Sequence, residues 1–510
     1  MAETNTSNIG FEKQIWDAAC VLRGNIDASE YKSVVLGLIF LKYISDRFEA
    51  KYQELVAEGD GFEEDKDEYT AENIFFVPEN ARWSVISAAA HTPEIGTVID
   101  EAMRSIEKEN KRLKDILPKN FARPELDKRR LGEVVDLFTN IQMIDHGNSK
   151  DILGRTYEYC LAKFAEQEGK LAGEFYTPQP VAKLMTQIAF LGREDKQGFT
   201  LYDATMGSGS LLLNAKRYSR QPQTVVYFGQ ELNTSTYNLA RMNMILHGVP
   251  IENQFLHNAD TLDEDWPTQE PTNFDGVLMN PPYSAKWSAS SGFMDDPRFS
   301  PFGKLAPKSK ADFAFLLHGY YHLKQDNGVM AIVLPHGVLF RGNAEGTIRK
   351  ALLEEGAIDT VIGLPANIFF NTSIPTTVII LKKNRTNRDV CFIDASKEFD
   401  KGKNQNIMTD AHIEKILNAY KSREDMDKFA HLASFEEIVE NDYNLNIPRY
   451  VDTFEEEEVE PLTEIVAKIN QTNATIESQT ASLLDMLGQL HGTTPEADEE
   501  LKAFVEAFKG

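Results

Sequence analysis

The first part of the chain carries apolar residues at helical spacing. Ser29 has the character of a helix N-cap, and it precedes a run of apolar positions at Val34, Val35, Leu38, Ile39, Leu41 and Ile44. No convincing strand alternation is present between Phe11 and about Phe138. We therefore expect an all-helical N-terminal domain over residues 1–148.

After Asp151 the pattern changes to short β-branched runs that alternate with helical stretches. These runs occupy residues 199–205, 224–231, 274–280, 328–335, 358–365 and 376–383. Continuous apolar strands separated by helices indicate a mostly parallel sheet that is covered on both faces. The last two runs lie close together, so we expect them to form an antiparallel pair. The pattern predicts an α/β domain over residues 149–453.

The third section is helical and carries a seven-residue apolar repeat. The repeat consists of Leu462, Ile469, Ile476, Leu483 and Leu490, with Ile465, Val466, Met486 and Leu487 beside it. Thr472, Asn473, Gln479 and Thr480 make its middle polar, so the seam needs a partner helix but is weak as a self-dimer. Two interpretations of residues 454–510 stay open: a partner-binding tail, or a helix that packs back on its own chain.

Charge bears on possible partners. The net charge is -26 and the sequence pI is about 4.9, which counts against nucleic-acid binding by the chain as a whole. Residues 111–130 nevertheless hold eight basic and three acidic residues, whereas residues 455–460 and 496–500 are acidic. Such patches could meet DNA locally or through a more basic partner, and each could equally be a solvated helix face.

Cysteine usage and the N-terminus point to a reducing compartment. Cys20, Cys160 and Cys391 show neither disulfide pairing nor metal-ligand spacing, so we predict no metal site. The N-terminus lacks an apolar signal segment, and the longest apolar run, residues 34–41, is too short to span a bilayer. We expect a cytoplasmic protein without membrane contact.

A glycine-containing loop follows the first predicted strand, in the sequence DATMGSGS from Asp203 to Ser210. Gly207 and Gly209 allow close approach of a ligand to the backbone, but Leu212 stands where a dinucleotide-binding loop would have a third glycine. The pattern favours a single nucleoside-like ligand without a pyrophosphate.

Two further acids follow predicted strands and could complete this binding site. Glu231 ends the second predicted strand, where a carboxylate can accept both ribose hydroxyls. Asp260 follows the place where a third strand should end, and it could accept from an adenine amine. Each acid, like Asp203, could instead be a strand-end N-cap, but three of them in register with a glycine loop make that reading weaker.

The segment VLMNPPYSAKW, residues 277–287, ends the next predicted strand in Asn280-Pro281-Pro282-Tyr283. A plain reading is a strand that stops at a proline turn. A second reading is chemical: the Asn280 side-chain oxygen and the Pro281 carbonyl could accept both hydrogens of an exocyclic base amine. That would favour a pyramidal, more nucleophilic nitrogen in the transition state. Pro282 would keep the acceptors rigid, and Tyr283 offers a ring for base stacking.

Several motifs in this order resemble a known family. GEFYTP (173–178), DATMGSGS, Glu231, Asp260 and NPPY resemble adenine-N6 DNA methyltransferases that use S-adenosylmethionine. DPRF (296–299), KADFAFLLH (310–318) and the segments 361–383 and 442–450 are similar to the modification subunit of type I restriction-modification enzymes. The resemblance implies a Rossmann-like methyltransferase domain between an all-helical N-terminal domain and a coiled-coil-like helical tail.

The resemblance also implies roles for individual residues. Glu174, Phe175, Tyr176, Thr177, Pro178 and Gln179 match the upstream cofactor-binding segment, and Ser208, Gly209 and Ser210 match the glycine loop. Ala204 departs from the proline that is common after this acid, which makes the loop less rigid. Phe369 or Phe370 resembles an aromatic that packs on the far side of a flipped base.

The family also implies partners: double-stranded DNA, a separate specificity subunit, a second copy of the modification subunit and a restriction subunit. Alternatives remain at this stage. Methyltransferases that act on glutamine or RNA bases share the NPPY chemistry, although they do not need the helical front and the tail. A scaffold subunit with a vestigial site is another, against which the intact Asn280 and Tyr283 count. No compelling nuclease motif supports a fused restriction enzyme.

Overall fold

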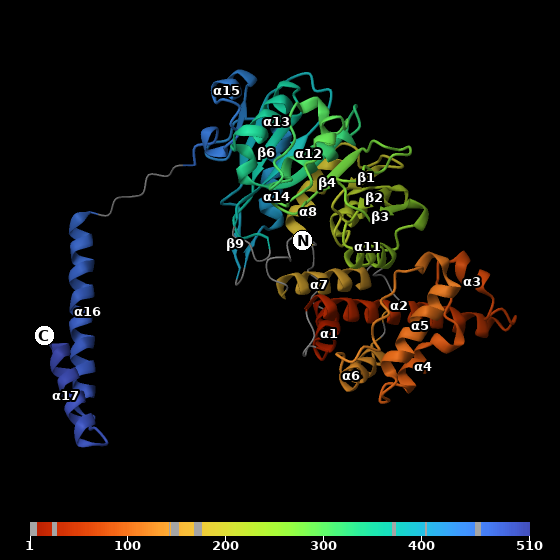
Figure 1. Cartoon of the computed structure of the whole chain (residues 1–510), viewed down its shortest axis with the longest axis horizontal. Coiled ribbons are helices and arrows are strands. Elements are labelled where there is room, and N and C mark those ends of the chain that lie inside the picture. The colour runs from red at the N-terminus through yellow and green to blue at the C-terminus, as the bar shows by residue number, and fades with distance from the viewer. Residues whose placement is uncertain are drawn as a thin grey trace. The chain divides into compact units, whose positions relative to one another are not determined.

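The computed structural model describes residues 8–22, 28–141, 143, 152–167, 176–369, 374–402, 405–453 and 461–509. The chain divides into two compact units, Met1–Thr453 and Phe454–Gly510 (Figure 1). Glu174, Phe175 and Phe370, predicted above as site residues, lie outside the described residues.

Helices build the front of the first unit. They are α1 (Asn8–Cys20), α2 (Ala28–Glu58), α3 (Lys66–Ala71), α4 (Trp83–Ala88), α5 (Ile95–Glu109), α6 (Lys128–Thr139) and α7 (Ile152–Gln167). Figure 1 shows these helices gathered at one end of the first unit. Their buried apolar side chains form one core, which includes Val34, Leu38 and Phe164. No strand occurs among the described residues of this region, as the helical spacing predicted. Helix α7 contributes to this core rather than to the core of the sheet.

A nine-stranded sheet follows, in the order β11-β8-β6-β7-β5-β4-β1-β2-β3. The strands are β1 (Thr200–Asp203), β2 (Val226–Gln230), β3 (Gln254–His257), β4 (Gly276–Met279), β5 (Val329–Pro335), β6 (Ile358–Gly363), β7 (Thr376–Leu381), β8 (Val390–Asp394) and β11 (Ala430–Ala433). Strands β3, β2, β1, β4 and β5 are parallel. The expected antiparallel pair is confirmed: β7 runs antiparallel to both β6 and β5, between which it lies.

Helices cover both faces of the sheet. Helices α8 (Gln179–Phe190) and α14 (Asp410–Ser422) pack with parts of α9 (Ser210–Leu213), α10 (Ala215–Tyr218) and α11 (Thr234–Leu246) in one core. Helices α12 (Asp312–Tyr321), α13 (Asn343–Glu354) and α15 (Phe435–Glu440) pack in a second core. Neighbouring residues of β1 divide between them, because Leu201 faces the first core and Tyr202 the second. The prediction of a doubly covered α/β sheet is therefore confirmed.

The order of the strands positions the site. From β3 the chain crosses to β4, which lies on the other side of β1, so the direction of winding changes between β1 and β4. Open α/β sheets bind ligands outside the carboxyl ends of the strands at such a switch point. The loops after β1 and β4 are the DATMGSGS and NPPY segments.

Helix α11 joins the two cores of the first unit. Leu239, Met242 and Leu246 of α11 pack in the core of the helical front. Asn238 Nδ2 donates to the Asp115 carbonyl at 2.9 Å, and Arg241 Nη1 donates to the Lys114 carbonyl at 3.2 Å. Part of the basic segment 111–130 is therefore docked on the α/β domain.

The second unit contains α16 (Leu462–Gly488) and α17 (Pro495–Lys509), which pack on each other. The seven-residue seam is exposed along its length: Leu462 is 78%, Ile476 is 54% and Leu490 is 55% exposed. Within this unit, α17 leaves the seam uncovered. Among the described residues, no helix is both long and apolar enough to cross a membrane.

Candidate active site

The glycine loop is built by backbone contacts between β1 and β2. Gly207 and Gly209 have φ angles of 55° and 76°, in the left-handed region that residues other than glycine rarely adopt. The Met206 N–H donates to the Gln230 carbonyl at 3.0 Å, and the Gly209 N–H donates to the Met206 carbonyl at 2.8 Å. The loop therefore turns tightly over the end of the sheet and leads into α9.

Side chains of α11 and of the loop itself hold this turn. Asn243 is fully buried, and its Nδ2 donates to the Ser208 carbonyl at 3.0 Å. The Ser208 and Ser210 hydroxyls lie 3.3 Å apart, and both residues are buried. Sequence reasoning assigned no role to Asn243, because its contact with the loop depends on how α11 packs.

Glu231 and Asp260 lie where the sequence predicted them. The Glu231 carboxylate accepts from the Gly207 N–H at 3.1 Å and from the Asn233 N–H at 2.7 Å. Asp260 Oδ1 accepts from the Leu262 N–H at 2.9 Å, as in an Asx turn. The adjacent Thr261 hydroxyl donates to the Ala204 carbonyl at 2.5 Å. The structure thus connects both acids to the glycine loop.

Asp203, at the end of β1, is almost completely buried. Burial raises the pKa of its carboxyl group to about 7, and the nearby Glu231 adds to the rise, although hydrogen bonds from Thr205 oppose it. A buried acid of this kind gains from a ligand that brings positive charge or hydrogen-bond donors.

The NPPY segment begins where β4 ends, between β1 and β5. Asn280 is 6% exposed. Its Nδ2 donates to the Thr177 hydroxyl at 3.2 Å, and its Oδ1 accepts from the Tyr283 hydroxyl at 2.9 Å. These two contacts fix the orientation of the amide.

The upstream segment lies next to this amide. Thr177 was expected at the cofactor, and the structure places its hydroxyl on Asn280. Tyr176 is buried in the helical core, Pro178 stands at the N-cap position of α8, and Gln179 Nε2 donates to Glu158 at 3.4 Å. The segment thus connects the helical front, α8 and the NPPY loop.

Phe369 packs against Tyr283 in an edge-to-face arrangement. The ring centroids are 6.0 Å apart at an interplanar angle of 80°, and Phe369 is only 1% exposed. A base held between two aromatic faces needs roughly parallel rings. The two rings are nearly perpendicular, so Phe369 packs on Tyr283 itself and does not form the second face of such a pair.

A buried carboxylate holds the turn after Tyr283. Ser284 has a φ of 53°, and its N–H donates to Asp312 Oδ1 at 2.7 Å. Arg341 Nη1 donates to Asp312 Oδ2 at 3.0 Å, and the Ala311 N–H donates to the Ala285 carbonyl at 2.9 Å. Sequence reasoning noted the KADFAFLLH motif but assigned no task to Asp312.

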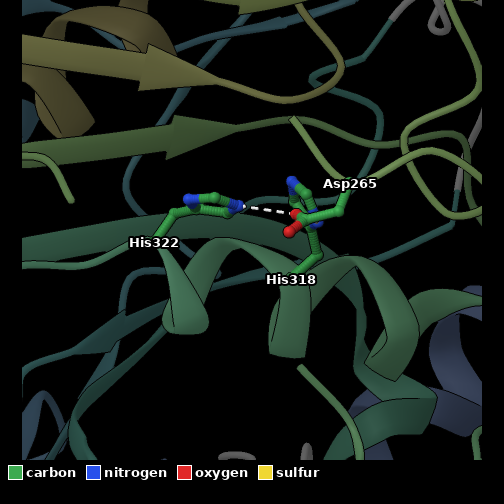
Figure 2. A group of neighbouring side chains, drawn as sticks. All are labelled: Asp265, His318 and His322. Atoms are coloured by element: carbon green, nitrogen blue, oxygen red, sulfur yellow. Dashed lines mark hydrogen bonds and ion pairs between the residues drawn. The ribbon is translucent and has the colours of Figure 1, made fainter. Parts of the chain in front are cut away.

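Asp265, His318 and His322 form a cluster beside the site (Figure 2). Their ligand-type atoms lie within 4.8 Å of one another, the proximity that a metal site requires. His322 Nδ1 faces the Thr272 carbonyl at 2.5 Å and Nε2 faces Asp265 at 2.9 Å, so both nitrogens point at acceptors. His318 Nδ1 lies 3.1 Å from Arg298 Nη1, which can only donate. The geometry therefore fits a hydrogen-bonded network, and the guanidinium disfavours a cation.

Comparisons with known proteins agree with this geometry. Residues 148–459 match the model of the N-6 DNA Methylase family, and residues 11–138 match that of the HsdM N-terminal domain. The chain belongs to the N-6 DNA methylase family. Within it, the chain is a modification subunit of a type I restriction-modification system. Its activity is the transfer of a methyl group from S-adenosylmethionine to the N6 amine of adenine in DNA.

Individual relatives cover most of the chain. The MpnII methylase subunit of Mycoplasma pneumoniae is 35% identical, with 88% of this chain and 90% of the relative covered. The MjaIX methylase subunit of Methanocaldococcus jannaschii is 31% identical, with 94% and 91% covered. The crystal structure of a type I methyltransferase subunit from Streptococcus thermophilus is 68% identical, with a TM-score of 0.82, and covers 88% of this chain and 100% of that one. The predicted resemblance is confirmed.

Proposed function

We propose that different loops at the carboxyl edge of the sheet bind the cofactor and the target base. The cofactor is held by Asp203, Gly207, Ser208, Gly209, Ser210, Glu231 and Asp260, together with residues 174–179. The target adenine is held by Asn280, Pro281, Pro282 and Tyr283. The observation that carries the proposal is the placement of Asn280 beside the glycine loop, with its amide oriented by Thr177 and Tyr283.

The residues present fit S-adenosylmethionine. The cofactor has hydroxyl donors on its ribose, an amine on its adenine, and positive charge on its ammonium and sulfonium groups. Three carboxylates at the ends of neighbouring strands are acceptors for such groups, and the glycine turn lets a nucleoside approach the backbone. When bound, the cofactor supplies an electrophilic methyl group on a sulfonium.

The chain's own residues act on the target amine. Asn280 Oδ1, which accepts from the Tyr283 hydroxyl in the structure, accepts one amine hydrogen of the target base. The Pro281 carbonyl accepts the other hydrogen, so the nitrogen becomes pyramidal and its lone pair is directed at the methyl group. Tyr283 stacks on the base, and Phe369 packs against the Tyr283 ring in a T-shaped contact. The adenine must first leave the duplex, which costs roughly a few kcal/mol.

We further propose that a separate specificity subunit selects the DNA sequence and binds two copies of this chain, which a restriction subunit joins. Helix α16 supports this arrangement, because α17, which packs on it within the second unit, leaves its apolar seam uncovered. Burying such a seam against partner helices removes apolar surface from water.

The basic segment 111–130 is the proposed DNA contact. Arg129 is exposed on α6, although it pairs with Glu133 at 2.7 Å. Lys128 is less suited, because its Nζ donates to the carbonyls of Phe121 and Arg123. The contact is therefore proposed for the exposed Arg129 and the partly exposed Arg130 rather than for Lys128.

The test is methyl transfer from tritiated S-adenosylmethionine to DNA, followed by nucleoside analysis. The purified chain is assayed alone and with its specificity subunit, and Asn280→Ala is the matched inactive control. Label in N6-methyladenine only with the subunit present supports the proposed division of labour. Methylation of DNA by the chain alone would mean that the chain itself recognises the target sequence. Label on RNA or protein would refute the assignment of the proposed site to adenine in DNA.

A further inference from the structure

Helix α12 contacts the two proposed pockets at once. At its first residue, the fully buried Asp312 accepts from the Ser284 N–H, directly after Tyr283. Arg341 neutralises the other carboxylate oxygen at 3.0 Å. Asp312 therefore holds the exit of the NPPY segment through a charge-assisted hydrogen bond in a site without water contact.

Six residues further along, α12 contacts the cofactor side. His318 is fully buried, and its Nδ1 lies 3.1 Å from Arg298 Nη1. Arg298, itself 2% exposed, donates to the carbonyls of Thr261 at 2.9 Å and Leu262 at 3.1 Å. These two residues directly follow Asp260, the proposed acceptor for the cofactor's amine. The guanidinium thus holds the backbone that carries this acid.

The chemistry of the network defines the state of His318. Arg298 has only donors, so Nδ1 of His318 accepts a hydrogen bond from it. The proton of the His318 ring therefore lies on Nε2, which is 2.7 Å from the Tyr202 hydroxyl oxygen. Burial, His322 and Arg298 all lower the pKa of His318, which keeps the ring neutral and Nδ1 available. Tyr202 in turn donates to the Trp266 carbonyl at 2.8 Å.

The two loops also touch each other directly. The Ser288 hydroxyl, beyond the NPPY segment, donates to Asp263 at 2.9 Å, beyond Asp260. Asp296 fixes Arg298 from a second side at 2.7 Å. The Ser288–Asp263 bond lies at the surface, whereas Arg298, His318 and Asp312 are buried, and buried groups that are hydrogen-bonded in this way are held rigidly.

We propose that α12 is the positioning element that joins the two pockets. His318 holds the Asp260 loop in position through Arg298, and Asp312 holds the turn after Tyr283 in position. The inference rests on the roles proposed above for Asp260 and Tyr283. His318 and Asp312 are both fully buried, so we assign them a positioning role that acts through Arg298 and through the Ser284 N–H.

Two variants of His318 separate its two hydrogen bonds. Gln places its amide near the Nε2 position and can serve Tyr202, whereas Asn places an oxygen near the Nδ1 position and can accept from Arg298. Loss of a hydrogen bond to a charged group is expected to weaken cofactor binding by about tenfold in His318→Gln. His318→Asn should stay within about threefold of the unmodified chain. Calorimetric titration of the full chain with S-adenosylmethionine measures both.

Asp312→Asn tests the other end of the helix. The amide keeps an acceptor for Ser284 but presents its NH₂ group to Arg341, two donors facing each other. We expect the rate of methyl transfer at saturating cofactor to fall by at least about tenfold, while the dissociation constant for the cofactor stays within about twofold. The rate is measured on the complex with the specificity subunit.

His322→Gln is the matched control, because His322 lies buried on the same helix but contacts Asp265 and the Thr272 carbonyl. Affinity near that of the unmodified chain supports the inference. Equal loss of cofactor affinity in His318→Gln and His322→Gln overturns it. A lower melting temperature in both α12 variants also overturns it if His318→Gln does not specifically lose cofactor affinity and Asp312→Asn does not specifically lose methylation rate. Asn280→Ala distinguishes failure of this inference from failure of the proposed function. If Asn280→Ala stops methylation but the α12 variants do not show the expected changes in affinity and rate, the proposed site stands and the inference fails.

Discussion

Replacement of Asp203 by Asn tests whether the buried carboxyl group at the end of β1 makes the free energy of unfolding depend on pH. The amide keeps the acceptor for the Thr205 N–H, which lies 2.9 Å from Asp203 Oδ1, but it does not titrate. In the folded chain burial raises the pKa of Asp203 from 3.8 to about 7. At about 1.4 kcal/mol per pH unit, this rise corresponds to about 4 kcal/mol.

The sign follows from which state binds more protons. Because the folded state holds the proton up to about pH 7, this carboxyl group favours folding at low pH, and that contribution is lost as the pH rises through the folded pKa. About half of the effect falls between pH 5.5 and 8.5. The free energy of unfolding of the unmodified chain should therefore drop by about 2 kcal/mol relative to Asp203→Asn over this range, which is about 2 °C in melting temperature for a chain of this size.

The assay is thermal unfolding of both cofactor-free chains at several pH values. Asp359→Asn is the control: burial alone would raise the pKa of Asp359, but Lys382, Arg423 and Arg385 lower it. A group of this kind stabilises at every pH above its unfolded pKa, so the control should be less stable by the same amount at pH 5.5 and 8.5. Parallel profiles for Asp203→Asn and the unmodified chain would refute the reasoning.

The remaining predictions concern binding, assembly and turnover. Asn280→Ala should lower the methylation rate by about two to three orders of magnitude and leave cofactor affinity nearly unchanged, whereas Glu231→Ala should weaken cofactor binding; full methylation by Asn280→Ala would contradict the mechanism. Deletion of residues 455–510 should abolish co-purification with the specificity subunit while cofactor titration stays normal; intact assembly would exclude the tail as docking site. Reversing Arg129 and Arg130 to Glu should weaken DNA binding by the assembled complex, most at low salt, with Lys128→Met as the control; unaltered affinity would remove this contact.

The position of the reactive loops could be predicted without the structure. Parallel strands joined by helices place their carboxyl ends at one edge, so Asp203, Glu231 and Asn280 had to lie near each other once the strands were recognised. The heptad seam likewise shows in the sequence, because helical periodicity is local. Strands β8 and β11 were not predicted, since their edge of the sheet depends on pairing between distant segments.

The contacts that hold those loops depend on tertiary packing. Thr177 reaches Asn280 from 103 positions away, and Arg298 links residues 261 and 262 to His318. Lys128 belongs to a basic run in the sequence, yet it turns inward to two backbone carbonyls.

Local pattern thus determined which residues carry the chemistry, because strand and helix periods place side chains on definite faces and edges. Only the tertiary structure decided which buried donors and acceptors orient them, because a hydrogen bond depends on distance and angle between segments whose approach no local pattern encodes.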